Sequence, residues 1–115
     1  MVDYQRMQNP LIGDDVITEA EARLRELYGS RFAGMAVRAP APGPDPEDDM
    51  DVEILVILRG EIERYREIRR VGWIASELGL ERDLALTILP VTEDEVDDPG
   101  WGYLGLSIKD AVRVS

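Results

Sequence analysis

The segment MDVEILVIL, Met50 to Leu58, constrains the fold of this chain more than any other stretch. Acidic and apolar residues alternate at its start, and its second half is continuously apolar. This change of pattern is typical of a β-strand that begins at the protein surface and ends in the core. The sequence therefore predicts a strand over 50–58 whose second half is buried.

The residues after this strand favour a helix and then a second strand. Arg59 and Gly60 turn the chain, and apolar spacing predicts a helix over 62–79 that Gly79 ends. The expected inward stripe of this helix is Tyr65, Ile68, Val71, Ala75 and Leu78. The run LALTILPV predicts a strand over 84–91. A strand, a helix and a strand in this order are typical of a crossover unit in a mixed or parallel sheet.

The remaining elements are shorter. Apolar residues spaced by three and four predict a helix over 15–28, and a short apolar stretch predicts a strand over 32–37. Thr92 and Glu95 fit a capping box, so a short helix should begin at Thr92. One further helix is expected near 107–112. Together these elements predict an α/β (α+β) fold with helices packed against a small mixed β-sheet.

Residues 39–49, APAPGPDPEDD, contain four prolines and four acids, which exclude a helix or a central strand. Neither flanking part is long enough to fold alone. We therefore interpret this stretch as a long loop inside a single domain that covers residues 1–115.

Composition excludes several kinds of chemistry. The chain has no cysteine and no histidine, so disulfides, thiolate zinc sites and the commonest general base are ruled out. Its net charge of -11 argues against direct nucleic-acid binding, because such a field repels a phosphate backbone. The sequence contains neither a membrane-spanning apolar stretch nor a signal peptide, which favours a soluble, cytoplasmic protein without membrane contact.

Three carboxylates lie at the entrance of the best-predicted strand. Asp49, Asp51 and Glu53 are two residues apart, so their side chains should project from one face at intervals of about 6.6 Å. Three acids on one face repel each other unless water, a cation or basic groups screen them. The ordinary interpretation is an exposed strand end with solvated acids, and the alternative is a site for a divalent cation.

The order of these features resembles the minimal nucleotidyltransferases of the DNA polymerase β superfamily. The resemblance covers most of the chain, through MDVEILVILRGEI, the helix YREIRRVGWIASELGL and then DLALTILPVTEDE. The family carries an SDxDhhVhL sequence whose two aspartates bind metal ions. One register places Asp51 and Glu53 at these positions with Met50 in place of the serine, and the other places Asp49 and Asp51 there. Asp51 is a ligand in both registers.

The resemblance implies two-metal catalysis, in which paired carboxylates hold Mg²⁺ ions that bridge the phosphates of ATP. Asp49, Asp51 and Glu53 would then be the catalytic carboxylates. A third metal-binding carboxylate comes from a neighbouring strand in the family, and Asp83 is the candidate here. Thr87 is the only polar residue deeper in that strand.

The chain departs from the family in the loop that holds the triphosphate. Family members have a Gly-Ser pair there, whereas this chain has Val37-Arg-Ala-Pro-Ala-Pro-Gly43. It contains no serine, and its prolines have no N–H to donate to a phosphate. Arg38 and Gly43 are the remaining candidates for nucleotide binding, and the acids at 45 and 47–49 oppose Arg38.

Three hypotheses follow. The leading one is a degenerate relative with impaired or lost activity that binds a partner protein, as family members encoded beside HEPN-type ribonuclease toxins bind those toxins. The second is an active, Mg²⁺-dependent enzyme that transfers a nucleoside monophosphate from ATP to a protein or small acceptor. The third is an unrelated, acidic α/β interaction domain.

Two surface features bear on partners. The arginines of the helix over 62–79 lie among glutamates, which is typical of a solvated face with helix-spaced ion pairs. These arginines are Arg64, Arg66, Arg69 and Arg70. Trp73 and Trp101 are expected to pack inside the protein, because no basic groove surrounds them in sequence. Exposed apolar residues on the Trp73 helix would instead indicate a seam between copies of a homo-oligomer.

Overall fold

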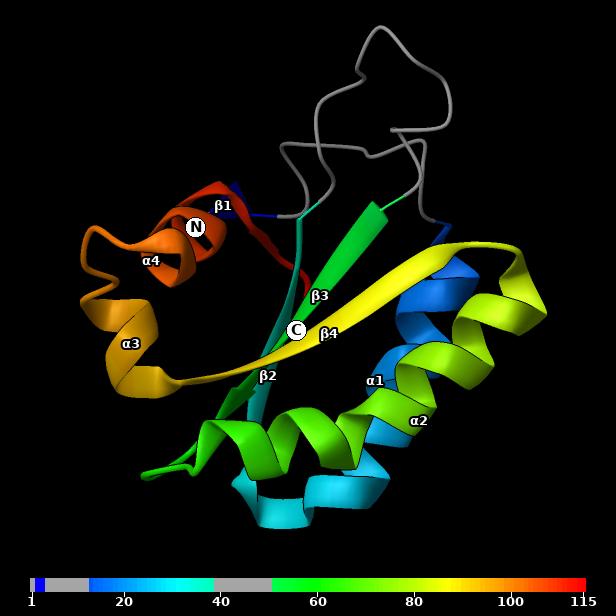
Figure 1. Cartoon of the computed structure of the whole chain (residues 1–115), viewed down its shortest axis with the longest axis horizontal. Helices are drawn as coiled ribbons and strands as arrows, with labels where there is room; N and C mark the ends of the chain where they lie inside the picture. Colours follow the sequence, from blue (N-terminus) through cyan, green and yellow to red (C-terminus); the bar gives the residue numbers. More distant parts are fainter. Residues whose placement is uncertain (1, 4–12, 39–50) are drawn as a thin grey trace, which may run out of the picture.

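Within the described residues, five strands form one mixed β-sheet in the order β1-β5-β2-β3-β4 (Figure 1). The computed structural model describes residues 2–3, 13–38 and 51–115. In sheet order the strands are Val2–Asp3, Val112–Arg113, Phe32–Arg38, Asp51–Leu58 and Ala85–Thr92. β3 lies between β2, to which it is antiparallel, and β4, to which it is parallel. The mixed sheet predicted from the sequence is confirmed.

Helices cover both faces of this sheet, as Figure 1 shows. They are α1 (Asp14–Tyr28), α2 (Arg64–Arg82), α3 (Glu93–Asp97) and α4 (Tyr103–Asp110), with a short 3-10 turn, η2, at Gly29–Arg31. α1 and α2 bury one face of β3 through Val52, Ile54 and Val56, while α3 and α4 pack near Leu55 and Ile57 on the other. No helix in the described part of the chain combines the length and apolar composition that a bilayer crossing requires.

The alternation of side chains along β3 explains both layers. Residues with even numbers face α1 and α2, and the odd-numbered Leu55 and Ile57 face α3 and α4. The apolar second half of the strand is buried on both sides, as its sequence predicts. The crossover from β3 through α2 to the parallel β4 is also confirmed, and so is the capping box of Thr92 and Glu95 at the start of α3.

α2 differs in length from the helix predicted over 62–79. It begins at Arg64 and continues past Gly79 to Arg82, so Gly79 is not its stop. A Cβ at Gly79 would lie 2.7 Å from the carbonyl oxygen of Leu84, which shows that the glycine lets the chain pass closely. The helix ends instead at Asp83, which adopts the left-handed conformation with φ 54°.

The prediction of the inward stripe of α2 was wrong at its first two positions. Tyr65 is 77% exposed and Ile68 is also exposed, while Val71, Ala75 and Leu78 are buried as predicted. Glu67 is buried instead, with 3% of its surface exposed. The Tyr28 hydroxyl donates to Glu67 at 3.1 Å, and the Arg31 guanidinium donates to its other oxygen at 3.4 Å. These donors compensate the burial of the carboxylate, and the helix can therefore turn Glu67 inward.

The end of the chain also differs from its prediction. α4 spans Tyr103–Asp110 rather than 107–112, and residues 112–113 form β5. β5 pairs with both β1 and β2, so the backbone of this segment bonds across the sheet instead of continuing the helix. Sheet pairing with distant residues cannot be read from local periodicity.

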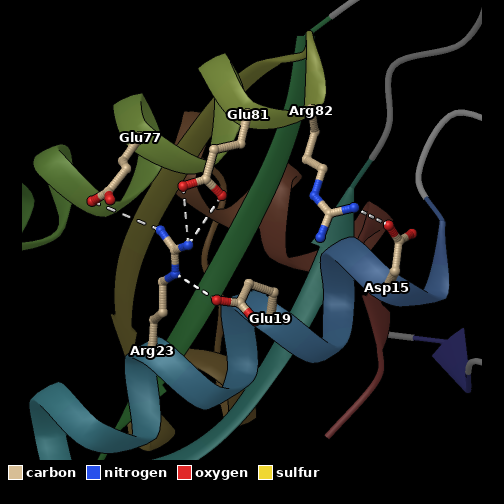
Figure 2. A network of polar contacts seen from close by, with 6 residues as sticks. All are labelled: Asp15, Glu19, Arg23, Glu77, Glu81 and Arg82. Atoms are coloured by element: carbon tan, nitrogen blue, oxygen red, sulfur yellow. Dashed lines mark hydrogen bonds and ion pairs between the residues drawn. The ribbon is translucent and has the colours of Figure 1, made fainter.

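An ion-pair network joins α1 to α2, as Figure 2 shows. Arg23 extends from α1 between three carboxylates, with its Nε 2.9 Å from Glu19 and its terminal nitrogens 3.8 Å from Glu77 and 3.1 Å from Glu81. The hydrogen bond to Glu19 contributes most to raising the pKa of Arg23. Arg82 and Asp15 form a second link between the same helices. These ion pairs link α1 and α2, which both pack on one face of the sheet.

Candidate functional site

Of the predicted carboxylates, Glu53 lies near the start of β3, on the side of the sheet that α3 and α4 cover. Asp51 is the first residue of β3 and pairs in register with Ala85 of β4. Glu53 lies between Arg38 of β2 and Thr87 of β4. Because strand positions two apart share a face, positions 51 and 53 are on the same face as Leu55.

Glu53 is largely buried at this position. Its side chain is 15% exposed, and the Tyr103 hydroxyl donates to its Oε2 at 3.4 Å. Its Oε1 is buried and accepts no hydrogen bond from any described residue. The nearest described cation is the Arg38 guanidinium, whose Nη1 is 4.0 Å from Oε1. Glu53 therefore depends on Arg38 for most of the compensation of its charge.

Arg38 is also bound to α4. Its Nη1 donates to the buried hydroxyl of Ser107 at 3.3 Å, and its Nη2 lies 3.6 Å from Asp110. Arg38, Glu53, Tyr103, Ser107 and Asp110 are called the sheet-face cluster below. Two carboxylates of the chain itself thus neutralise the guanidinium that the sequence predicted as a phosphate ligand.

The described residues do not fit a magnesium ion at Glu53. A cation beside its oxygens would have to displace Arg38, because like charges at this distance repel each other. Within the described residues, no group of three or more acidic, histidine or cysteine side chains could hold a metal ion. Asp49 and Gly43 lie outside the described residues. Metal binding by Asp49 and Asp51 stays a prediction.

Asp83 and Thr87 were the candidates from the neighbouring strand. Asp83 is exposed and caps the C-terminus of α2, two residues before the start of β4. Thr87 is exposed and is in register with Glu53. The hydroxyl of Thr87, rather than the carboxylate of Asp83, is therefore next to Glu53 along the ladder.

Sequence reasoning missed three members of the sheet-face cluster. Tyr103, Ser107 and Asp110 come from α4, about fifty residues after Glu53 in the chain. The spacing of these residues, at i, i+4 and i+7, places them on one side of a helix and was the only available signal. It could not indicate that this side faces Arg38.

A second feature is the outer face of α2. Tyr65, Arg69 and Trp73 are spaced by four residues and are all exposed, Trp73 at 55%. Trp73 borders a shallow hollow of about 340 Å³ between α1 and α2. In the described part of the chain, the side chains of Arg66 and Arg69 make no ion pair, whereas Arg64 pairs with Glu95 and Arg70 with Glu67. The prediction of a solvated face with ion pairs holds for part of this helix.

Both tryptophans were expected to pack in the interior, and both are exposed. Trp101 is 92% exposed, and its ring contacts only the ammonium group of Lys109, at 4.6 Å, among the described ring interactions. Trp73 lies on the opposite side of the sheet from α4. Neither tryptophan belongs to the buried clusters, which consist mostly of aliphatic residues.

Comparisons of the chain with models of protein families, with curated proteins and with solved structures gave no match. What the chain does is therefore inferred from its own residues.

Proposed function

We propose that this chain is a degenerate relative of the minimal nucleotidyltransferases that acts by binding a partner protein, as an antitoxin binds its toxin. The outer face of α2 carries the proposal. Tyrosine, arginine and tryptophan are the residue types enriched at the centres of protein interfaces, and Tyr65, Arg69 and Trp73 present all three on one exposed stripe. A partner with carboxylates opposite Arg66 and Arg69 would form ion pairs with these two side chains.

The sheet-face cluster supports the loss of activity. An enzyme of the resembled family needs carboxylates free to hold Mg²⁺ and a cation free to hold phosphate. In this chain Arg38 and Glu53 lie against each other, and Asp110 and Ser107 bind the same guanidinium. Arg38 and Glu53, the described candidates for phosphate and metal binding on this face, are thus both engaged by other groups of the chain.

One observation favours the alternative of an active, Mg²⁺-dependent nucleotidyltransferase. Glu53 Oε1 is buried without a hydrogen bond among the described residues, and position 51 shares its strand face. A ligand for this oxygen would relieve its burial. The two candidate functions therefore differ in whether Mg²⁺ and ATP bind.

Thermal unfolding with millimolar Mg²⁺ and ATP separates the two candidates. A ligand at a hundredfold excess over its Kd stabilises the native state by about 2.7 kcal/mol, so binding would raise the Tm measurably. We expect no change in Tm. The control is Asp51→Ala. If Mg²⁺ and ATP stabilise the wild-type chain and this stabilisation is lost in Asp51→Ala, the chain binds the metal and nucleotide that the alternative requires.

Co-purification tests the partner directly. The chain is co-expressed with the product of the gene beside its own, which the proposal expects to be a helical ribonuclease-type protein, and the complex is captured through a tag on that product. We expect Trp73→Ala to weaken capture by roughly tenfold or more, because truncation of an interface tryptophan typically costs more than about 1.4 kcal/mol.

Trp101→Ala is the matched control, since Trp101 is also exposed but lies on the other side of the sheet. It should leave capture unchanged. Equal loss in both variants, or no capture of the neighbouring protein by the wild-type chain, would contradict the proposal.

A further inference from the structure

β4 is an edge strand with one side open. It lies at the end of the strand order and, in the described part of the chain, pairs only with β3. Pro90 has no N–H to donate to β3, and its carbonyl oxygen accepts from Arg64 instead. The backbone groups of Pro90 therefore face away from β3. Leu86 and Ile88 share that direction because backbone groups alternate along a strand. Their N–H and C=O groups make no hydrogen bond with any other described residue on that side.

The second half of this edge is closed. Arg64 Nε donates to the carbonyl oxygen of Pro90 at 3.4 Å, and the same guanidinium binds Glu95 of α3. α2 and α3 pack on opposite faces of the sheet, so this ion pair passes around the edge of β4. Together with Pro90 it prevents further strand pairing beyond residue 90.

The first half of the edge has no such protection. β4 contains no charged residue in a chain of which 32% is charged, and charged side chains are the usual defence of an edge strand. A groove of about 610 Å³ lies between this half of β4 and the end of α2, lined by Gly79, Leu80 and Leu86 among others. Leu80 is 85% exposed there. An apolar groove beside unpaired backbone groups is the setting for an added strand.

We propose that a second copy of this chain pairs with the open half of β4, antiparallel and centred on Thr87, so that the two sheets become continuous. In this register, Leu86 of each copy exchanges backbone hydrogen bonds with Ile88 of the other. The two Thr87 residues form a non-hydrogen-bonded pair with Cα atoms about 4.5 Å apart, an arrangement that favours threonine. The ladder ends where Pro90 of one copy meets Leu84 of the other.

Charge selects both the orientation and the second copy. The open half is bounded by the exposed acid Asp83 at one end and by the Arg64 guanidinium near Pro90 at the other. Antiparallel pairing around Thr87 brings Asp83 of each copy opposite Val91 of the other, next to that guanidinium. The edge is therefore compatible with itself: its centre is uncharged, and at each end Asp83 approaches the Arg64 guanidinium, which also pairs with Glu95 of its own copy. This inference does not depend on the proposed function.

The full chain provides a direct test, because it contains no native cysteine. Sedimentation of the wild-type chain over a range of micromolar concentrations, at physiological ionic strength, should show a monomer–dimer equilibrium. Under mild oxidation, Thr87→Cys should form a covalent dimer, since non-hydrogen-bonded pairs meet the distance that a disulfide requires. Ser30→Cys, at an exposed serine of η2, should form far less.

Thr87→Lys tests the register by charge. It places two lysines opposite each other across the joint, and we expect the Kd of the dimer to rise by roughly tenfold or more. Thr87 is exposed and faces Glu53 in its own chain, so the monomer should fold normally, which circular dichroism checks. Thr18→Lys, on the exposed side of α1, is the matched control and should dimerise like the wild type.

Three results would overturn the proposal. They are a wild-type chain that stays monomeric at every concentration, a dimer that Thr87→Lys does not weaken, and cross-linking of Thr87→Cys no greater than that of Ser30→Cys. Capture of a protein partner through Trp73 should be unaffected by Thr87→Lys, and failure of either proposal therefore leaves the other standing.

Discussion

Glu67 is the residue whose surroundings differ most from those usual for its type. It is nearly fully buried between α1 and α2, where the Tyr28 hydroxyl donates to it and Arg31 and Arg70 lie close. If a hydrogen-bond donor is removed from such a buried carboxylate, its desolvation is no longer compensated and the folded state loses stability. Burial, and then the charge of Glu67, raise the pKa of the Tyr28 phenol above its ordinary value of 10.0.

This raised pKa predicts a loss of stability in alkaline solution. Above pH 10.0 the unfolded chain releases the Tyr28 proton while the folded chain retains it, so the folded state binds more protons and stability falls as pH rises. Tyr28→Phe should remove this part of the pH dependence. At neutral pH it should lower the free energy of unfolding by about 1–2 kcal/mol, because Glu67 loses a donor.

Urea unfolding at neutral pH and at about pH 11 measures both effects on either side of the ordinary tyrosine pKa. Tyr65→Phe is the control, since Tyr65 is exposed and should change neither quantity. If stability falls as steeply at alkaline pH in Tyr28→Phe as in the wild type, groups other than Tyr28 cause the fall.

At the scale of elements, α3 depends on its N-terminal cap more than the other helices do. It is only five residues long, so few internal hydrogen bonds support it. The Thr92 hydroxyl accepts from the Glu95 N–H at 3.1 Å, and the Glu95 carboxylate accepts from the Thr92 N–H at 2.9 Å. Glu95 also binds Arg64, so the cap positions the ion pair that closes the edge of β4.

Thr92→Ala should lower the free energy of unfolding by about 0.5–2 kcal/mol, the range for loss of an N-cap hydroxyl. Thr92→Ser keeps the hydroxyl and should cost much less. Chemical denaturation of both variants gives the comparison. A serine variant as unstable as the alanine variant would attribute the effect to the lost methyl group instead.

The whole molecule carries a net charge of -11, which destabilises its compact state by self-repulsion. Salt weakens this repulsion and also weakens local pairs such as those of Arg23. Because the excess of like charge extends over the whole protein and exposed ion pairs contribute little each, the repulsion should dominate. We expect the Tm to rise as monovalent salt increases from low to physiological ionic strength.

Differential scanning calorimetry in NaCl and in KCl tests this expectation. Both salts should act equally, because screening depends on ionic strength and not on ion identity. A Tm that falls with salt would mean that the ion pairs between α1 and α2 outweigh the net repulsion.

Much of this architecture could be predicted from the residues alone, because its causes are local. The period of two in β3, the period of three to four in α1 and the reciprocal cap of Thr92 each depend on neighbours within one or two turns. The same is true of the exclusion of cysteine and histidine chemistry. These features therefore identified the mixed sheet and the order of its central elements.

Other features needed contacts between distant parts of the chain. α2 turns Glu67 inward and Tyr65 outward because Tyr28 and Arg31 supply donors from another helix and turn. Arg38 faces Glu53 and Asp110 because α4 folds back over the sheet. In each case the deciding energy is the burial or pairing of a polar group with a residue far along the chain, which local periodicity does not contain.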